Sequence, residues 1–336
     1  MLKKYFVFLI AIFHCPSFVH ANLLEDYAND LNAGEWVDLP SDQSLLELPM
    51  SYALHFWADS GTWDPVNKRI IWMGGPGSCC GNPPTYQLMI YELETDTWTI
   101  AATPYALSGH GYDGNAYDSL TENFYFSFYG QEVVKKWNDG KWSELPPVPY
   151  SMSSNIASLE WFPEANNGKG ALMHFGCFGK SSWFDGTAWH DVSKTEMGIH
   201  HTFAQYNPVH KIVWFRGSDN RHFVIDPTFR ITELKSVPPV DLNYPNGYGD
   251  KGGWKTVDPI SGKYLYFSGL DNSIWEFDVL LDSWNKTALA KPIFHSGSSG
   301  FTVPIPEYGV NFVLNHYWTK RGAQLYKHRV VGHKTN

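Results

Sequence analysis

The stretch TWDPVNKRIIWMGG at residues 62–75 decides the fold, because related stretches recur five more times along the chain. Each copy places a turn, built on Asp-Pro, Asn-Pro or a variant, between two strand-like runs. The anchor positions of the six turns are 54, 44, 45, 51 and 47 residues apart, and they are Asp64, Asp118, Phe162, Asn207, Asp258 and Ile305. A period of about 45–50 residues made of short strands predicts a β-propeller.

Each repeat is predicted to form one blade of four antiparallel strands, A to D, with the anchored turn between A and B. A second hairpin joins C to D, and in the second and third repeats it turns on Asp-Gly, a strong hairpin signal. In three other repeats two strand residues separated by six intervening residues are expected at equivalent positions, namely Tyr91 and Trp98, Phe277 and Trp284, and Val224 and Ile231.

The sixth repeat ends without an outermost strand, and a matching segment stands at the other end of the chain. Residues 34–40 (GEWVDLP) have the pattern of the outer strand at residues 141–147 (KWSELPP). We expect residues 34–40 to pair with the last blade, because an open ring would leave sheet edges unpaired. The predicted fold class is all-β: a six-bladed β-propeller of four-stranded antiparallel blades, closed by an N-terminal strand, in a single domain at residues 22–336.

The repeat pattern resembles the kelch repeat, in which an apolar strand ends in Gly-Gly and is followed by an aromatic residue and then a Trp. Gly74-Gly75, Tyr91 and Trp98 match that motif in full; four further repeats keep one glycine, and the sixth keeps none. The resemblance implies a propeller. It does not select a function, because kelch propellers include enzymes, lectin-like binders and interaction scaffolds.

The first 21 residues have the features of a secretory signal peptide: a basic head, an apolar run and a small-residue exit at Ala21. We therefore expect a secreted or periplasmic protein, acting as a monomer. Removing the signal changes the formal net charge from −9 to −11. An acidic surface disfavours nucleic acid as a partner, and no later segment is long and apolar enough for membrane insertion.

The loops before strand A and after strand B should share one face of the disc, so their polar residues are predicted to converge at one mouth of the central channel. Five of the twelve histidines beyond residue 21 lie in the segments before strand A. The candidate ligand-binding residues are His55, His201, Asp250, Lys251 and His295, and the candidate catalytic residues are His110, Tyr112, His200 and Arg216. Asp113 stands in the same glycine-rich segment as His110.

The chemistry predicted for this mouth is directed at carbohydrate, since aromatic residues make up 16% of the chain and aromatic faces suit sugars. A polysaccharide lyase that cleaves by β-elimination needs a base, an acid and a cation beside a uronate carboxylate. His110 or His200 could serve as base, Tyr112 as acid, and Arg216 or Lys251 as cation. The alternatives are a pure glycan binder, a sugar isomerase, and an interaction scaffold without catalysis.

Three cysteines follow the predicted signal peptide, and an oxidising compartment would permit a disulfide among them. Cys79 and Cys80 could bridge each other, or one of them could bond Cys177; the second is favoured because a vicinal bridge needs unusual backbone geometry. Histidines from several blades could surround a metal in the channel, but no close ligand spacing supports one. No cofactor is therefore predicted.

Overall fold

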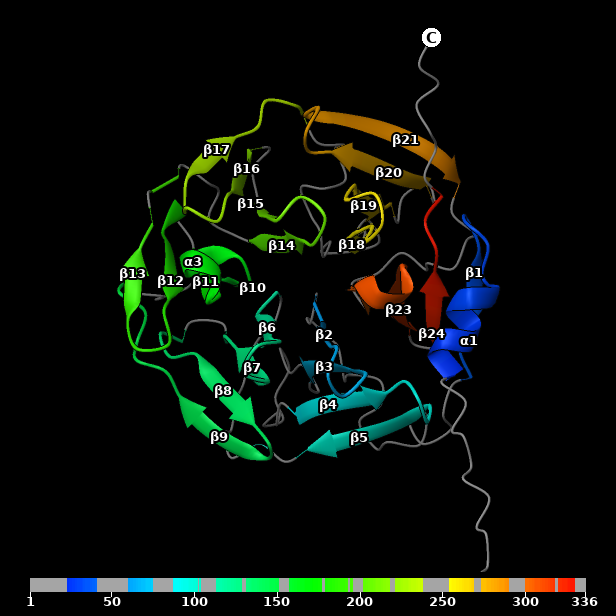
Figure 1. Cartoon of the computed structure of the whole chain (residues 1–336), viewed down its shortest axis with the longest axis horizontal. Helices are drawn as coiled ribbons and strands as arrows, with labels where there is room; N and C mark the ends of the chain where they lie inside the picture. Colours follow the sequence, from blue (N-terminus) through cyan, green and yellow to red (C-terminus); the bar gives the residue numbers. More distant parts are fainter. Residues whose placement is uncertain are drawn as a thin grey trace, which may run out of the picture.

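The computed structural model shows a ring of six four-stranded antiparallel sheets around a central channel (Figure 1). It describes residues 23–40, 60–74, 87–101, 103, 113–128, 131–150, 157–176, 179–192, 194–195, 202–217, 221–237, 254–268, 273–289, 300–317 and 320–329. The predicted six-bladed propeller is confirmed. The predicted signal peptide lies outside the described residues, and none of the helices within them is long and apolar enough to cross a membrane.

The blades follow one another along the chain. Blade 1 contains β2 (Thr62–Asp64), β3 (Arg69–Gly74), β4 (Gln87–Glu92) and β5 (Thr97–Ala101), and blade 2 contains β6 (Asn115–Asp118), β7 (Asn123–Phe126), β8 (Lys135–Asn138) and β9 (Lys141–Glu144). Blade 3 contains β10 (Ser158–Phe162), β11 (Ala171–Phe175), β12 (Ser181–Phe184) and β13 (Trp189–Asp191), and blade 4 contains β14 (Phe203–Asn207), β15 (Ile212–Arg216), β16 (His222–Ile225) and β17 (Ile231–Glu233). Blade 5 contains β18 (Trp254–Val257), β19 (Tyr264–Phe267), β20 (Ser273–Asp278) and β21 (Ser283–Leu289).

Blade 6 is completed from both ends of the chain, as predicted. It contains β22 (Gly300–Ile305), β23 (Val310–Tyr317) and β24 (Lys320–Tyr326), and β1 (Trp36–Asp38) pairs antiparallel with β24 as its outermost strand (Figure 1). Trp36 lies opposite Tyr326 and the two rings stack, with centroids 4.3 Å apart. The N-terminal strand therefore leaves blade 6 without an open outer position, and the ring closes.

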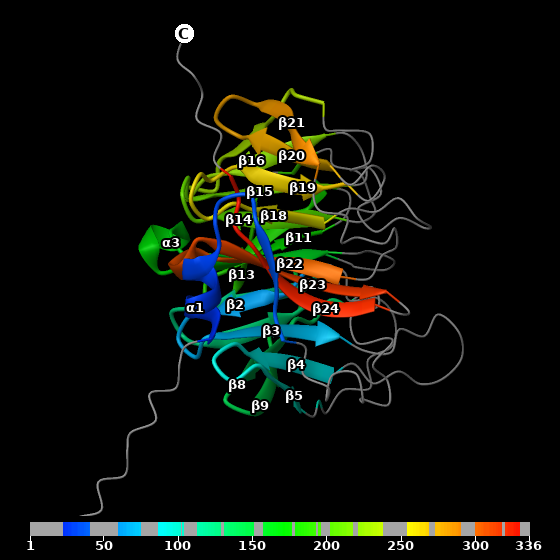
Figure 2. The ribbon, with the colours of Figure 1, turned by 90° about the vertical axis from the view of Figure 1, so that its right-hand side faces the viewer.

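Within the described residues, three short helices supplement the sheets: α1 (Leu23–Asp30), α3 (Ala165–Gly168) and η3 (Pro306–Tyr308). α3 and η3 lie within the A–B turns of blades 3 and 6, and α1 lies against η3. All three mark the same face of the disc, on the left in Figure 2. Leu24 and Ala28 of α1 are buried in the core between blades 6 and 1, so this amphipathic helix seals the closure on that face.

The apolar core is divided among the six interfaces between neighbouring blades. Each interface contains its own cluster of buried side chains, from the large one between blades 6 and 1 to the small one between blades 5 and 6. Trp72 shows the pattern: it is fully buried and packs edge-on against Phe301 of blade 6, with ring centroids 5.0 Å apart. Alternating apolar strand residues are thus used on both faces of every blade, which explains the high aromatic content.

The outer hairpins agree with the sequence in two of the three predicted pairs. Tyr91 lies opposite Trp98, and Phe277 opposite Trp284, with stacked rings in both pairs. The third prediction was wrong by one residue, because Val224 pairs with Thr232 rather than with Ile231. The reason is a three-residue loop at 227–229, which ends on a residue in the left-handed region (φ 63°) and shifts the register.

Candidate functional site

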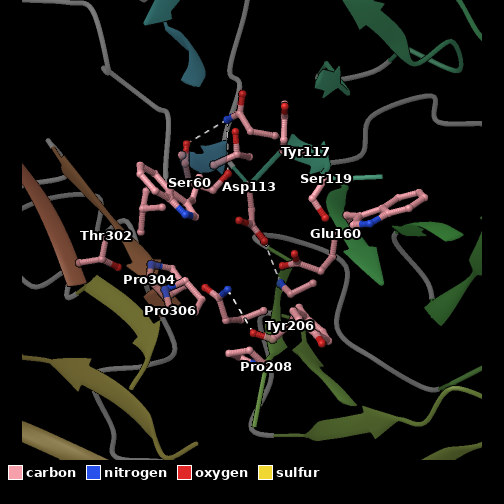
Figure 3. Close-up of a pocket in the computed structure, with 18 of the residues that line it drawn as sticks. Ser60, Asp113, Tyr117, Ser119, Glu160, Tyr206, Pro208, Thr302, Pro304 and Pro306 are labelled. Carbon is pink, nitrogen blue, oxygen red and sulfur yellow. Dashed lines mark hydrogen bonds between the residues drawn. The ribbon is translucent and has the colours of Figure 1, made fainter. Parts of the chain in front are cut away.

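The inner strands enclose a pocket in the central channel (Figure 3). Its volume is about 210 Å³. The wall combines residues at the start of strand A, such as Ser60 and Asp113, with residues of the A–B turns, such as Pro65, Pro163 and Pro208. The pocket therefore extends along the inner strands as far as the face formed by the A–B turns.

The recurring Asp or Asn of the sequence builds this end of the pocket. The Asp64 carboxylate accepts hydrogen bonds from the backbone N–H groups of Val66 and Asn67, at 3.0 Å each. The side chains of Asp118 and Asn207 hold their own turns through the same two positions. Asp and Asn favour such turns because their short side chains reach the backbone two and three residues ahead. The repeat that identifies the fold thus also shapes the channel mouth.

Two carboxyl groups extend from blades 2 and 3 to the inner edge of blade 4. Asp113 accepts a hydrogen bond through its side chain from the Ala204 N–H (2.8 Å) and through its carbonyl oxygen from the Leu159 N–H (2.9 Å). Glu160, on β10, accepts hydrogen bonds from the backbone N–H of Tyr206, two residues beyond Ala204 on β14. Because β14 is the innermost strand of blade 4, the N–H groups on its inner edge have no partner strand, and the two carboxyls accept hydrogen bonds from them.

Glu160 is an acid of the pocket whose surroundings strongly perturb its pKa. Burial and, after it, the negative charge of Asp113 raise the pKa of Glu160 well above its usual value. Backbone hydrogen bonds from Tyr206 and Trp161 oppose this rise without cancelling it. Glu160 therefore retains its proton at pH values at which an ordinary glutamate is ionised.

Polar side chains next to the pair are held by contacts between blades. Asn115 accepts a hydrogen bond from the Met73 N–H (2.8 Å) and donates to the carbonyl oxygen of Ser60 (3.0 Å). The Tyr206 hydroxyl donates to Glu164 (2.7 Å); burial and this bond raise the pKa of Tyr206, so its hydroxyl stays protonated. These residues give the pocket a wall that is fixed from both sides.

Aromatic rings and one cation complete the described lining. The Trp63 indole N–H donates to Glu307 of blade 6 (2.7 Å), which fixes the plane of the ring beside the channel. The Lys255 ammonium lies 4.1 Å from the centroid of the Phe203 ring, in cation–π range. Among the described lining residues, Asp113, Glu160 and Glu307 are acidic and Lys255 is the one lysine, while Lys68 outside the lining lies 3.9 Å from Glu307.

Of the residues predicted for the site, the structure describes only Arg216. It lies at the end of β15 opposite Phe203, at the predicted end of strand B, but it is buried and is not among the described lining of the pocket. Its Nε donates to the carbonyl oxygen of Gly217 (3.1 Å). The other candidates lie outside the described residues, and they are His55, Cys79, Cys80, His110, Tyr112, Cys177, His200, His201, Asp250, Lys251 and His295.

Sequence reasoning placed Asp113 correctly before an inner strand and missed Glu160. A signal was present, because Glu160 is the charged residue of the otherwise uncharged run SLEWF in β10. A lone acid in a short inner strand must face either the apolar interface or the channel. No group of three or more metal-ligating side chains occurs within the described part of the chain.

Comparisons with known proteins show the fold and no family. No protein-family model and no curated protein matches this chain, so the kelch resemblance remains a prediction. A gluconolactonase from Xanthomonas campestris is similar in structure, with a TM-score of 0.52, 14% identity, and coverage of 88% of this chain and 99% of that one. An auxiliary nutrient binding protein from Bacteroides thetaiotaomicron has a TM-score of 0.52 and 10% identity, covering 80% and 68%.

A virginiamycin B lyase from Staphylococcus aureus, in complex with quinupristin, also has a similar structure. Its TM-score is 0.50 and its identity 10%, with 87% of this chain and 99% of that chain covered. All three are distant propellers, and at this identity they establish the architecture alone.

Proposed function

We propose that this propeller is an exported, carbohydrate-directed protein and that its central pocket binds a sugar. The observation that carries the proposal is the pairing of aromatic surface with a fixed carboxyl pair in one small pocket. Trp63 and Tyr206 offer ring surface for the C–H face of a sugar, while Asp113 and Glu160 offer oxygen atoms for its hydroxyls. Hydrogen bonds across the blades hold these groups in place before a ligand arrives.

The charge of the described lining favours a neutral sugar over an acidic one. Asp113 and Glu307 would repel a uronate carboxylate; Lys255 is the lysine of this lining, and Lys68 offsets part of the Glu307 charge from 3.9 Å. A uronate lyase requires a basic pocket, which the described residues do not form. Cleavage by β-elimination therefore depends on the histidines and Lys251 outside the described residues, and it remains a prediction.

The proposal is tested by calorimetric titration with neutral monosaccharides and their methyl glycosides. Binding by the wild type and loss of at least about tenfold in affinity for Glu160→Ala, equal to about 1.4 kcal/mol, are expected. Glu233→Ala is the matched control, because Glu233 is also a strand glutamate but is exposed on the outermost strand of blade 4. An affinity that is equal in both variants, or no binding of any sugar, would remove this pocket from consideration.

The raised pKa of Glu160 beside a second carboxyl favours a second candidate, which is turnover of the bound sugar. A neutral Glu160 can donate a proton to a leaving oxygen, and the charged Asp113 can accept one from an attacking water. A hydrolysis of this kind needs an acid and a base with separated pKa values in one pocket. Similar folds accommodate both activities, since one neighbour is described as a gluconolactonase and another as a nutrient-binding protein.

Turnover is tested with chromogenic glycosides and sugar lactones. Glu160→Gln should bind the sugar and release no product, whereas the wild type should lose activity on the alkaline side as Glu160 ionises. Equal rates for wild type and Glu160→Gln would leave binding as the function of the site. A rate that rises through the alkaline range would contradict Glu160 as the acid.

A further inference from the structure

The face formed by the A–B turns carries exposed aliphatic side chains around the pocket. Four of them occupy the same position, two residues after the anchor of the turn, and they are Val66, Leu120, Val209 and Ile260. Their exposed fractions are 53%, 57%, 39% and 60%. The residue before each of three of them, Pro65, Ser119 and Pro208, lines the pocket. Val66, Leu120 and Val209 thus follow directly on the pocket wall, and Ile260 occupies the equivalent position in blade 5; the four residues are here called the turn rim.

The turn rim is divided into two arcs. In blades 3 and 6 the equivalent position holds Glu164 and Glu307, whose carboxylates are engaged by Lys211 and by Trp63. Val209 and Ile260 therefore form an arc on blades 4 and 5, and Val66 and Leu120 form a second arc on blades 1 and 2. A ligand that leaves the pocket over either arc meets aliphatic surface instead of charge.

Close contacts link the A–B turns of blades 4, 5 and 6. Gly262 stands against Val209, and a Cβ added there would lie 2.9 Å from the Val209 Cβ. Gly309 stands likewise against Ile260, with a distance of 2.8 Å to Cδ1. The missing side chains allow each turn to touch the next, so Val209 and Ile260 lie on adjoining turns, with the His210 ring also against Gly262. The outer turn of blade 5 adds Leu280 and Leu281, exposed at 70% and 62%, on the same face.

We propose that the ligand of this site is a glycoside with an apolar aglycone, whose sugar occupies the pocket while its alkyl or aryl group lies on Val209 and Ile260. The inference rests on the proposed sugar site and adds the substrate class. An aliphatic surface that adjoins a polar pocket suits a molecule with both characters. An alkyl group that lies on Val209 and Ile260 shields these two side chains from water, and its own apolar surface is buried as well.

The test uses methyl and octyl β-D-glucosides, galactosides, mannosides and N-acetylglucosaminides, below their micellar concentrations. We expect the octyl form of the bound sugar to bind at least about tenfold more tightly than its methyl form, as burial of about two methylene groups would give. The double variant Val209→Ser/Ile260→Ser should lose this difference while keeping the affinity for the methyl glycoside.

Two controls separate the arc from general hydrophobic binding. Val66→Ser/Leu120→Ser changes the opposite arc at matched exposure, and Val237→Ser changes an exposed valine (73%) outside the turn rim. Both should keep the octyl preference. Loss of the preference in either control, or its survival in Val209→Ser/Ile260→Ser, would overturn the inference.

The remaining outcomes are also decisive. If methyl and octyl glycosides bind equally, the apolar subsite is absent while the proposed sugar site stands. If neither form binds for any of the four sugars, both proposals fail. Sedimentation of the ligand-free wild type completes the test: a dimer that Val209→Ser/Ile260→Ser converts to a monomer would assign the arc to a second copy of the chain.

Discussion

Two glutamates of this ring, Glu276 on the third strand of blade 5 and Glu160 on the innermost strand of blade 3, have opposite surroundings. Glu276 is buried and is contacted by the Lys263 ammonium (2.6 Å) and the His328 ring (3.1 Å). Burial acts to raise the pKa of Glu276, but the hydrogen bonds and charges of His328 and Lys263 hold it below its usual value. Glu160 instead faces Asp113, and its pKa is raised.

The difference separates an acid with a structural role from the acid that we propose to act in the pocket. At Glu276 each carboxylate oxygen has a positively charged or ring N–H partner, so the charge is compensated and joins blade 5 to the end of blade 6. At Glu160 the surroundings supply another negative charge and backbone N–H groups, and the carboxyl borders a pocket. An acid whose pKa is perturbed without a compensating cation nearby is typical of proton-transfer sites and ligand sites.

The largest effect is expected from Glu276→Ala. Removing this carboxylate leaves Lys263 and the buried His328 without their acid, and breaking a buried pair in this way costs about 3–5 kcal/mol. Guanidinium unfolding followed by tryptophan fluorescence measures the change. A loss below about 1 kcal/mol would show that the contacts of Glu276 with Lys263 and His328 do not stabilise the fold. Glu276 would then no longer serve as the structural acid in the comparison with Glu160.

The loss of stability at low pH gives a second test of the contrast between Glu276 and Glu160. Because the pKa of Glu276 is lowered in the fold, its contribution is present above the unfolded value near 4.5 and is lost as the pH falls through the folded value. Relative to Glu276→Gln, the wild type should lose about 1.5–3 kcal/mol between neutral pH and pH 3, the range for hydrogen bonds to charged groups. A stability difference between the two proteins that is independent of pH would contradict the assignment.

The sequence predicted the features that repeat and missed those that occur once. Asp64 and Asn207 recur in register with the strands, and residues 34–40 match an outer strand, so turns and closure followed from pattern alone. Glu160 and Glu276 each occur in one blade, and no periodicity marks them. Their pKa values depend on Asp113 and His328, which are 47 and 52 residues away in the chain.

The candidate mouth shows the limit of counting residue types. The histidines before strand A directed attention to one end of the inner strands, and the described pocket extends to the other end, where the turns are built by Asp, Asn and Pro. Those residues were recognised as fold signals. Their second role, as the wall of a pocket, becomes visible only when six turns are brought around one axis.

A smaller effect of opposite sign is expected at Glu160. Because its pKa is raised in the fold, the folded state binds the proton more tightly than the unfolded one, and stability falls as the pH rises above about 4.5. Glu160→Gln keeps the shape of the neutral acid and removes this dependence. At pH 8 the variant should be more stable than the wild type by about 1 kcal/mol, or a few degrees in Tm, and at pH 4 the two should coincide.

Scanning calorimetry at the two pH values measures this difference, and Glu276→Gln serves as the opposite control because it should destabilise at neutral pH. A Glu160→Gln variant that is less stable than wild type at pH 8 would mean that the ionised carboxylate is a favoured partner of the Ala204–Tyr206 edge. Both glutamates would then stabilise the fold as carboxylates, and the proposed role of Glu160 in the pocket would lose its support.

The smallest effect is expected at Glu233, which calibrates the other three. Its carboxylate pairs with Arg221 at 2.7 Å, and this bond is the main reason that the pKa of Glu233 is lowered. Both side chains are exposed, by 46% for Glu233 and 36% for Arg221, so water screens the pair. Glu233→Gln should change the unfolding free energy less than the other three variants do, and 0.5 M salt should erase the change. A larger loss would show that an exposed ion pair is enough to stabilise these blades. The contrast between Glu276 and Glu160 would then come from the charge of their partners and not from where the two glutamates lie in the fold.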